Sequence, residues 1–167
     1  MSQKKLSFFH PVSLVSTWFG SGLIKFAPGT WGSLAALPFA WAISSYTGSL
    51  GLIVASLVAY GVGIWASGQY STALGKEDPG AVVIDEVAGQ WLALAFVPLN
   101  PVLFLISFLI FRFFDIVKVF PANWLDQNIK GGLGIMSDDM VAGLYALITF
   151  YLLYEFLPYT SELLHHF

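Results

Sequence analysis

Carboxylates are the residues in this chain best placed to do chemistry, because they gather in short tracts beside long uncharged stretches. Eight of the ten acidic residues fall within residues 76–86, 112–126 and 130–139. The sequence around these tracts is Val, Leu, Ile, Phe, Ala and Gly in runs long enough for a bilayer. Hard divalent cations take oxygen ligands, and neighbouring carboxylates repel one another without a cation. The pattern predicts a membrane protein that holds a divalent cation at the ends of its spans.

Two pairs of adjacent carboxylates are the main candidate metal ligands. Asp85 and Glu86 stand between a short and a long apolar run, so at least one must face the bundle interior or a wet cleft. The alternative is an interfacial pair that headgroups solvate or a nearby lysine neutralises. Asp138 and Asp139 follow a glycine-rich loop that could bring backbone amides to the same place. The alternative there is that Ser137 or Asp138 caps the last helix.

A third tract combines both signs of charge. Arg112, Asp115 and Lys118 recur three residues apart, which stacks them along one face of a helix. They could form a structural ladder of ion pairs at a helix end. They could equally form a mixed site in which Asp115 binds metal and the two cations hold phosphate. Spacing alone favours neither reading, and Asp126 is a lesser ligand candidate.

A turn near the N-terminus offers further groups for an anion. Residues 25–33 contain Lys25, two glycines, Thr30 and Ser33 ahead of the first apolar segment. A phosphate could rest against backbone amides, hydroxyls and the lysine at this helix N-terminus. The simpler reading is a Pro-Gly turn with Ser33 as the N-cap, and the absence of the full P-loop spacing favours it.

Composition places the chain in lipid and excludes several classes of protein. Hydrophobic residues make up 57% of the 167, charged residues 10%, and the mean hydropathy is +0.75. A soluble domain carries roughly 25% charged residues. The absence of cysteine excludes disulfides, zinc thiolate sites and cysteine-nucleophile phosphatases. Six Trp and seven Tyr suit interfacial belts better than base stacking, so we expect no nucleic-acid partner.

The uncharged stretches predict an all-α membrane bundle of about five spans in a single domain, residues 1–167. Short amphipathic helices are expected at the N-terminus and in a cytoplasmic loop. Pro98, Asn100 and Pro101 divide the uncharged run 87–111 into a hairpin. The expected spans are 33–46, 50–74, from near 82 to the Pro98 turn, 102–120 and 140–157.

This topology puts the N-terminus and the loops 75–86 and 112–139 on one side, together with every lysine and arginine. The positive-inside rule makes that side cytoplasmic. A four-span alternative, with 87–111 as one helix, would scatter cations and carboxylates over both sides.

The candidate residues together suit metal-assisted phosphoryl hydrolysis at a membrane surface. We expect the metal ligands to be Asp85, Glu86, Asp138 and Asp139, the catalytic carboxylates Asp85, Asp115 and Asp139, and the phosphate-binding residues Lys25, Thr30, Ser33, Arg112 and Lys118. Magnesium would neutralise phosphate oxygens, a carboxylate would act as base, and a lipid could present its headgroup while its tails stay in the bilayer. The sequence leaves open which carboxylate is the base. The rival function is a small ion- or proton-coupled transporter, but such proteins usually carry mid-span charges and repeated halves.

Four ordered motifs give the sequence a resemblance to a known family. They are APGTWGS at 27–33, DEVAG at 85–89, FRFFDIVK at 111–118 and GLGIMSDD at 132–139. Together they resemble the phosphatidylglycerophosphatase A family over roughly residues 10 to 155. The resemblance implies a magnesium-dependent enzyme of the bacterial inner membrane that converts phosphatidylglycerophosphate to phosphatidylglycerol. The family's usual Lys-Pro-x-Pro reads KVFP here at 118–121, a change that removes no charged group.

Overall fold

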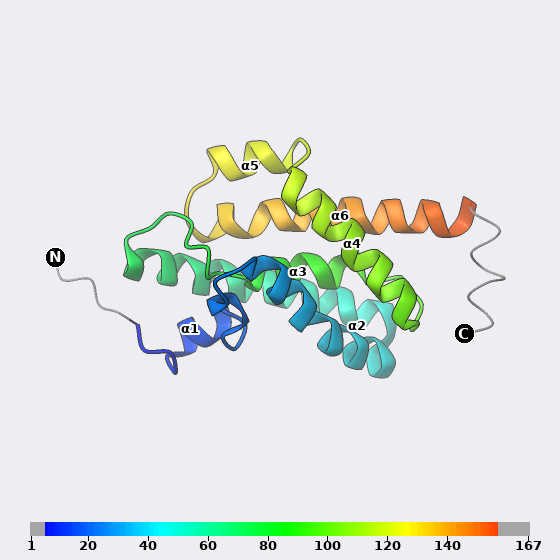
Figure 1. Ribbon diagram of the computed structural model, residues 1–167, viewed down its shortest axis with the longest axis horizontal. Coiled ribbons are helices and arrows are strands. Elements are labelled where there is room, and N and C mark those ends of the chain that lie inside the picture. The colour runs from blue at the N-terminus through cyan, green and yellow to red at the C-terminus, as the bar shows by residue number, and fades with distance from the viewer. Residues whose placement is uncertain (1–5, 157–167) are drawn as a thin grey trace.

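The computed structural model describes residues 6–156, and this part of the chain contains helices and no strands (Figure 1). The predicted all-α class is confirmed. The elements in order are α1 (Pro11–Ser16), the 3-10 helix η1 (Ser21–Leu23), α2 (Pro28–Leu74), α3 (Ile84–Ala93), α4 (Pro101–Val117), α5 (Ala122–Asn128) and α6 (Gly131–Phe156). Short helices occur, as expected, near the N-terminus (α1) and in the loop before the last long helix (α5).

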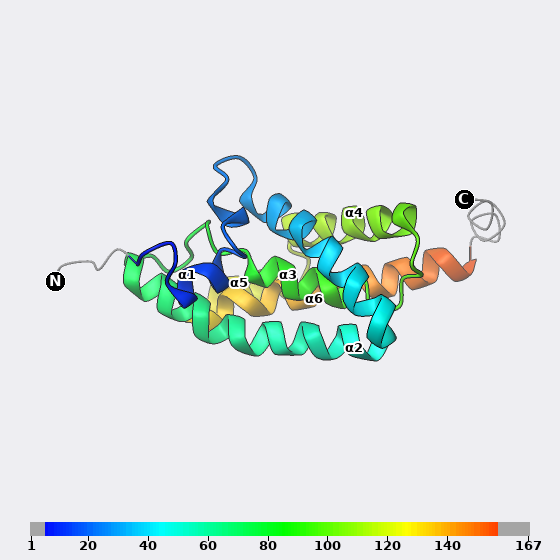
Figure 2. The same ribbon diagram turned by 90° about the horizontal axis from the view of Figure 1, so that it is seen from below.

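The 47-residue α2 is a helical hairpin. Gly48 has φ 67° and ψ −167°, a backbone conformation outside the helical region that glycine adopts without strain. The chain reverses direction at Gly48, and the second arm of α2 runs back along the molecule, opposite in direction to the first arm (Figure 2). The break predicted between the spans 33–46 and 50–74 is therefore confirmed.

The five membrane spans predicted from the sequence are only partly matched by the described helices. Among the described residues, two segments are long and apolar enough to cross a membrane, Pro28–Leu74 and Gly131–Phe156. The 10 residues of α3 rise only about 15 Å, half of the hydrocarbon thickness. Helix α3 ends at Ala93, where the chain turns. The next long helix, α4, is capped by Asn100, whose side-chain oxygen accepts hydrogen bonds from the backbone amides of Val102 and Leu103. The five-span count is not confirmed.

Two helices begin earlier than expected, which corrects the predicted caps. Helix α2 starts at Pro28, where the fixed φ of proline suits the first helical position, so Ser33 is an interior residue and not an N-cap. Helix α6 starts at Gly131, which has a left-handed φ of 72°. Ser137 and Asp138 therefore lie inside α6, and the glycine-rich tract expected to be a loop is helical.

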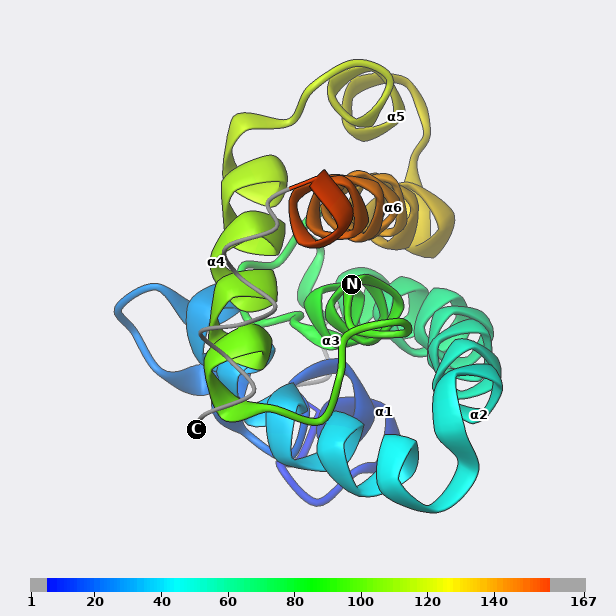
Figure 3. The same ribbon diagram turned by 90° about the vertical axis from the view of Figure 1, so that its right-hand side faces the viewer.

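Helix α3 occupies the centre of the molecule, surrounded by α2, α4 and α6 (Figure 3). It packs on α6 through backbone: a Cβ added to Gly143 would overlap the carbonyl oxygen of Gly89, and one added to Gly89 would overlap that of Asp139. Polar bonds fix it to α2, where Ser56 Oγ donates to the Ala88 carbonyl at 2.8 Å. The first turn of α3 is thereby held against the part of α6 that carries Asp139.

We expect Gly143→Ala to lower stability by about 1–3 kcal/mol, because the added methyl must push α3 away from α6. The matched control is Gly61→Ala, a helical glycine in α2 with no atom within 4 Å of an added Cβ. That change should be neutral or mildly stabilising, since alanine is the better helix former. Thermal unfolding in detergent measures both. Equal midpoints for the two variants would contradict the close approach of α3 and α6.

Candidate active site

The three acidic tracts meet at a single cavity of about 250 Å³. All eight of their carboxylates line it: Glu77, Asp78, Asp85, Glu86, Asp115, Asp126, Asp138 and Asp139. The only cations in its lining are Lys118 and Lys130. Within the described part of the chain, residues distant in sequence thus assemble into one strongly acidic site. The loop 75–83 and the helices α3, α4, α5 and α6 all contribute to it.

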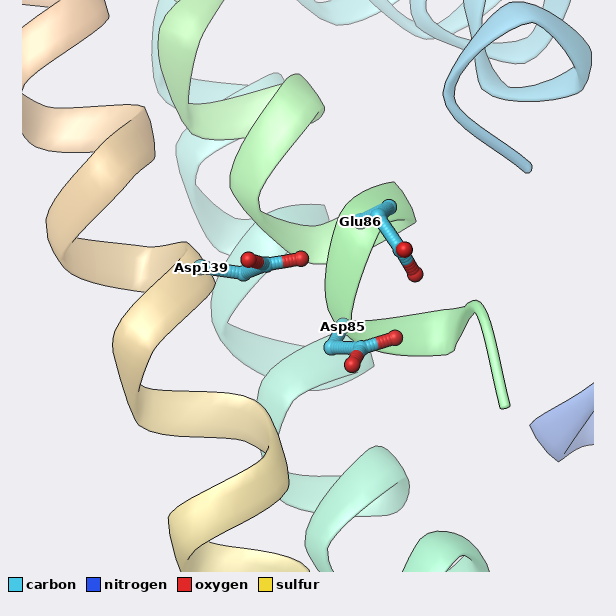
Figure 4. A group of neighbouring side chains, drawn as sticks. All are labelled: Asp85, Glu86 and Asp139. Atoms are coloured by element: carbon cyan, nitrogen blue, oxygen red, sulfur yellow. The ribbon is translucent and has the colours of Figure 1, made fainter. Parts of the chain in front are cut away.

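The centre of the site is formed by Asp85 and Glu86 in the first turn of α3 and Asp139 of α6. One carboxylate oxygen from each lies within 4.8 Å of the others (Figure 4). Asp139 is only 4% exposed. Three carboxylates this close repel one another strongly unless a cation or protons neutralise them.

Several oxygens in the cluster lack partners, and this tests whether a metal fits. Asp85 Oδ1, Glu86 Oε2 and Asp138 Oδ1 are buried and accept no hydrogen bond. Buried polar atoms in proteins are normally satisfied, so these oxygens are suited to a ligand. A hard divalent cation prefers this donor set, and only a small contraction of the 4.8 Å group would bring the oxygens onto one ion at about 2.1 Å. The residues therefore fit magnesium.

Arg112 neutralises one side of the cluster. Its Nη1 is paired with Asp115, lies 3.9 Å from Glu86 Oε1 and donates to Ser33 Oγ at 3.4 Å. The predicted Arg112–Asp115 pairing is thus present. Asp115 and Asp139 both line the cavity, so α4 adds a carboxylate to the site beside the central cluster.

The glycine of the first motif has a steric role at this point. A Cβ on Gly29 would overlap Glu86 Oε1 and lie 3.1 Å from Arg112 Nη1. Any larger residue would displace the carboxylate or the guanidinium. The Pro-Gly tract therefore serves the site by allowing the start of α2 to approach it closely.

Lys118 does not continue the ladder expected with Arg112 and Asp115. It ends α4 in a left-handed conformation with φ 48°, which turns its side chain away from the helix face. Its Nζ instead lies 2.7 Å from Asp138 Oδ2 and 2.9 Å from Asp126 Oδ1. Partial burial lowers the pKa of Lys118, but the hydrogen bonds to Asp138 and Asp126 more than offset this and raise it above its ordinary value. Lys118 is a permanent cation at the cavity wall.

Other sequence candidates lie elsewhere. Lys25 is exposed, Thr30 is partly buried, and neither lines the cavity, whereas Ser33 is fully buried and reaches the site through Arg112. Three residues that were not among the predicted site residues also line the cavity: Asp78, Glu77 and Lys130. These last two form an exposed ion pair of 2.8 Å at the cavity edge. Glu77 and Lys130 could have been predicted as site residues from their positions within the acidic tracts 76–86 and 130–139.

A helical chain with two segments able to cross a bilayer and one carboxylate-rich cavity is a membrane-associated protein with a buried acidic site. The family model for phosphatidylglycerophosphatase A matches residues 14–154, and the chain belongs to this family of phosphatases.

Relatives span most of the chain. Phosphatidylglycerophosphatase A of Haemophilus influenzae is 38% identical over 146 residues, covering 87% of this chain and 90% of the relative. The Escherichia coli protein of the same name is 38% identical over 144 residues, covering 86% and 83%. A provisionally named phosphatidylinositol-3-phosphatase of Bacteroides thetaiotaomicron is 40% identical over 148 residues, covering 84% and 91%. No solved structure matches the chain significantly.

Proposed function

We propose that the protein hydrolyses the terminal phosphomonoester of phosphatidylglycerophosphate with the help of magnesium. Water attacks phosphorus, the bond from phosphorus to the ester oxygen breaks, and the products are phosphatidylglycerol and inorganic phosphate. The observation that carries the proposal is the group of Asp85, Glu86 and Asp139 oxygens within 4.8 Å of one another, in a cavity lined by Lys118. Arg112 lies behind the lining, 3.9 Å from Glu86 and paired with Asp115. The two phosphatidylglycerophosphatase A relatives support the choice of substrate.

The residues take distinct roles in this proposal. Asp85, Glu86 and Asp139 would hold the magnesium ion, with Asp138 beside them. When bound, the ion supplies positive charge to the phosphate oxygens and lowers the pKa of a coordinated water. Arg112 binds the non-bridging oxygens from one side of the cavity, oriented by Ser33.

Lys118 binds phosphate from the other side of the cavity as a point charge. One carboxylate among Asp85, Asp115 and Asp139 takes the proton of the attacking water. Lys25 and Thr30, which lie outside the cavity lining, are not assigned a role.

We further propose a multi-pass arrangement in a bacterial inner membrane, with the cavity on the cytoplasmic side. The two arms of α2 and the long α6 would cross the bilayer, and the 17 residues of α4, which rise about 26 Å, would nearly do so. Helix α3 would enter from the cavity side and end part-way. The support is the distribution of charge: Arg112, Lys118 and Lys130 all lie at the cavity end of the molecule.

Phosphate release by the purified protein in mixed detergent–lipid micelles tests this function. With Mg²⁺ present, phosphatidylglycerophosphate should be turned over at least about tenfold faster than phosphatidic acid, phosphatidylinositol 3-phosphate or a soluble phosphate ester, because the proposed substrate carries its phosphomonoester on the glycerol headgroup of a lipid, which the other three lack. Adding a chelator should stop release. Equal rates on all four esters would contradict the substrate, and no release from any of them would contradict the function.

A further inference from the structure

An apolar groove runs between the first arm of α2 and α4. It is lined by Leu34, Leu37, Pro38, Trp41, Pro101, Phe104 and Leu105. The two helices are antiparallel neighbours (Figure 1), and they run apart toward the Gly48 turn (Figure 2). Trp41 packs on Phe104 with their rings 5.0 Å apart, which closes the floor of the groove. No charged residue lines it.

The groove lies on the same two helices that meet beside the candidate active site. Ser33 and Arg112, in contact at 3.4 Å, belong to the same two helices. Leu37 and Trp41 follow Ser33 at intervals of four residues, which keeps them on one helix face. Leu105 and Pro101 precede Arg112 by seven and eleven residues, spacings that place all three on one face of α4. The eight helical steps from Ser33 to Trp41 span about 12 Å along the helix axis.

The groove also opens outward, away from the protein core. Leu105 is 50% exposed, and Pro38 and Pro101 are exposed too. In a bilayer this side would meet lipid. The groove therefore joins a phosphate-binding arginine at one end to an apolar channel open to hydrocarbon along its length.

We propose that this groove holds one acyl chain of the phosphorylated lipid while its phosphate lies at Arg112. This inference rests on the function proposed above and adds the residues that orient the lipid. A second apolar cavity, beside Phe150 and Tyr154, is a poorer match, because its charged lining residue is Glu155, which would repel a phosphate.

The physics of the bilayer decides what such a groove does. Lipid tails are as apolar as leucine, so moving a chain from the bilayer into the groove gains little hydrophobic free energy. The gain is in orientation, since a chain held in the groove aligns the headgroup with the carboxylates, and small misplacements of a reacting group cost large factors in rate. The groove should therefore affect turnover of chain-bearing substrates relative to chain-free ones.

The test compares tryptophan substitutions at two residues of α4 that point in different directions. Leu105→Trp fills the groove, whereas Ile106→Trp changes the next residue, which points about 100° around the helix, is 38% exposed and does not line the groove. The measured quantity is kcat/KM for dioleoyl phosphatidylglycerophosphate divided by kcat/KM for its deacylated headgroup. This ratio should fall about tenfold in Leu105→Trp and stay within twofold of wild type in Ile106→Trp. Equal ratios in both variants, or equal losses on both substrates, would overturn the proposal.

A second readout does not depend on turnover. Phosphatidylglycerophosphate with a photoactivatable diazirine in one chain should label peptides from 34–41 and 101–105 in the wild type, and Leu105→Trp should reduce that labelling severalfold. Phosphatidylcholine with the same chain should label these peptides much less. If phosphate release is absent but headgroup-dependent labelling of the groove persists, the hydrolytic function is wrong and the lipid site stands. Identical labelling by both lipids would overturn the lipid site.

Discussion

Asp139→Asn is expected to lower phosphate release from phosphatidylglycerophosphate by roughly 10³-fold while the protein still inserts in the membrane. The substitution removes the charge that α6 contributes to the Asp85, Glu86 and Asp139 cluster and changes the side-chain volume very little. Asp85→Asn should behave in the same way, because its oxygen lies in the same 4.8 Å group. Inorganic phosphate release at saturating Mg²⁺ measures the effect.

The matched control is Glu155→Gln, which removes an exposed carboxylate near the other end of α6. It should retain nearly all activity. Metal binding gives an independent measurement: electron paramagnetic resonance of added Mn²⁺ should show a bound ion in the wild type and in Glu155→Gln, and a much weaker one in Asp139→Asn. Turnover above a tenth of wild type in both Asp139→Asn and Asp85→Asn would remove these residues from the chemistry.

Arg112→Ala should reduce kcat/KM by about 10²- to 10³-fold. Arg112 contacts Ser33, Glu86 and Asp115, so its removal takes away the phosphate-binding charge and also leaves two carboxylates without their partner. Arg112→Lys keeps the charge but loses the planar fork of donors, and it should recover only part of the activity.

Lys25→Ala is the control for Arg112→Ala. It also removes one cation, but the residue is exposed and lies outside the cavity lining. It should lower kcat/KM by less than threefold. Thermal unfolding of each variant separates a catalytic loss from a loss of fold. If Lys25→Ala and Arg112→Ala lose activity equally, the assignment of phosphate binding from the structure is wrong.

The features that could be predicted from the sequence are those set by the positions of charged residues and of apolar runs. The gathering of carboxylates beside apolar stretches predicted that Asp85, Glu86 and Asp139 would converge, and the structure brings them together. The break between the expected spans 33–46 and 50–74 was also predicted, and the structure places it at Gly48.

The incorrect predictions have three different physical causes. Glycine-rich sequence normally argues against helix, yet residues 131–134 are helical because their small size allows α6 to lie against α2, where a Cβ on Gly132 would overlap the Ile64 carbonyl. Lys118 left the predicted ladder because the last residue of α4 adopts a left-handed conformation that spacing rules do not consider. The length of α3 was overestimated because hydropathy reports where a chain is apolar and not where its helix stops.

The contact between Gly89 and Gly143 limits how the proposed metal site can adjust. Since main chain meets main chain there, α3 and α6 cannot move closer to each other. The oxygens of Asp85, Glu86 and Asp139, which lie within 4.8 Å of one another, must therefore close around an ion by side-chain rotation and not by movement of the two helices.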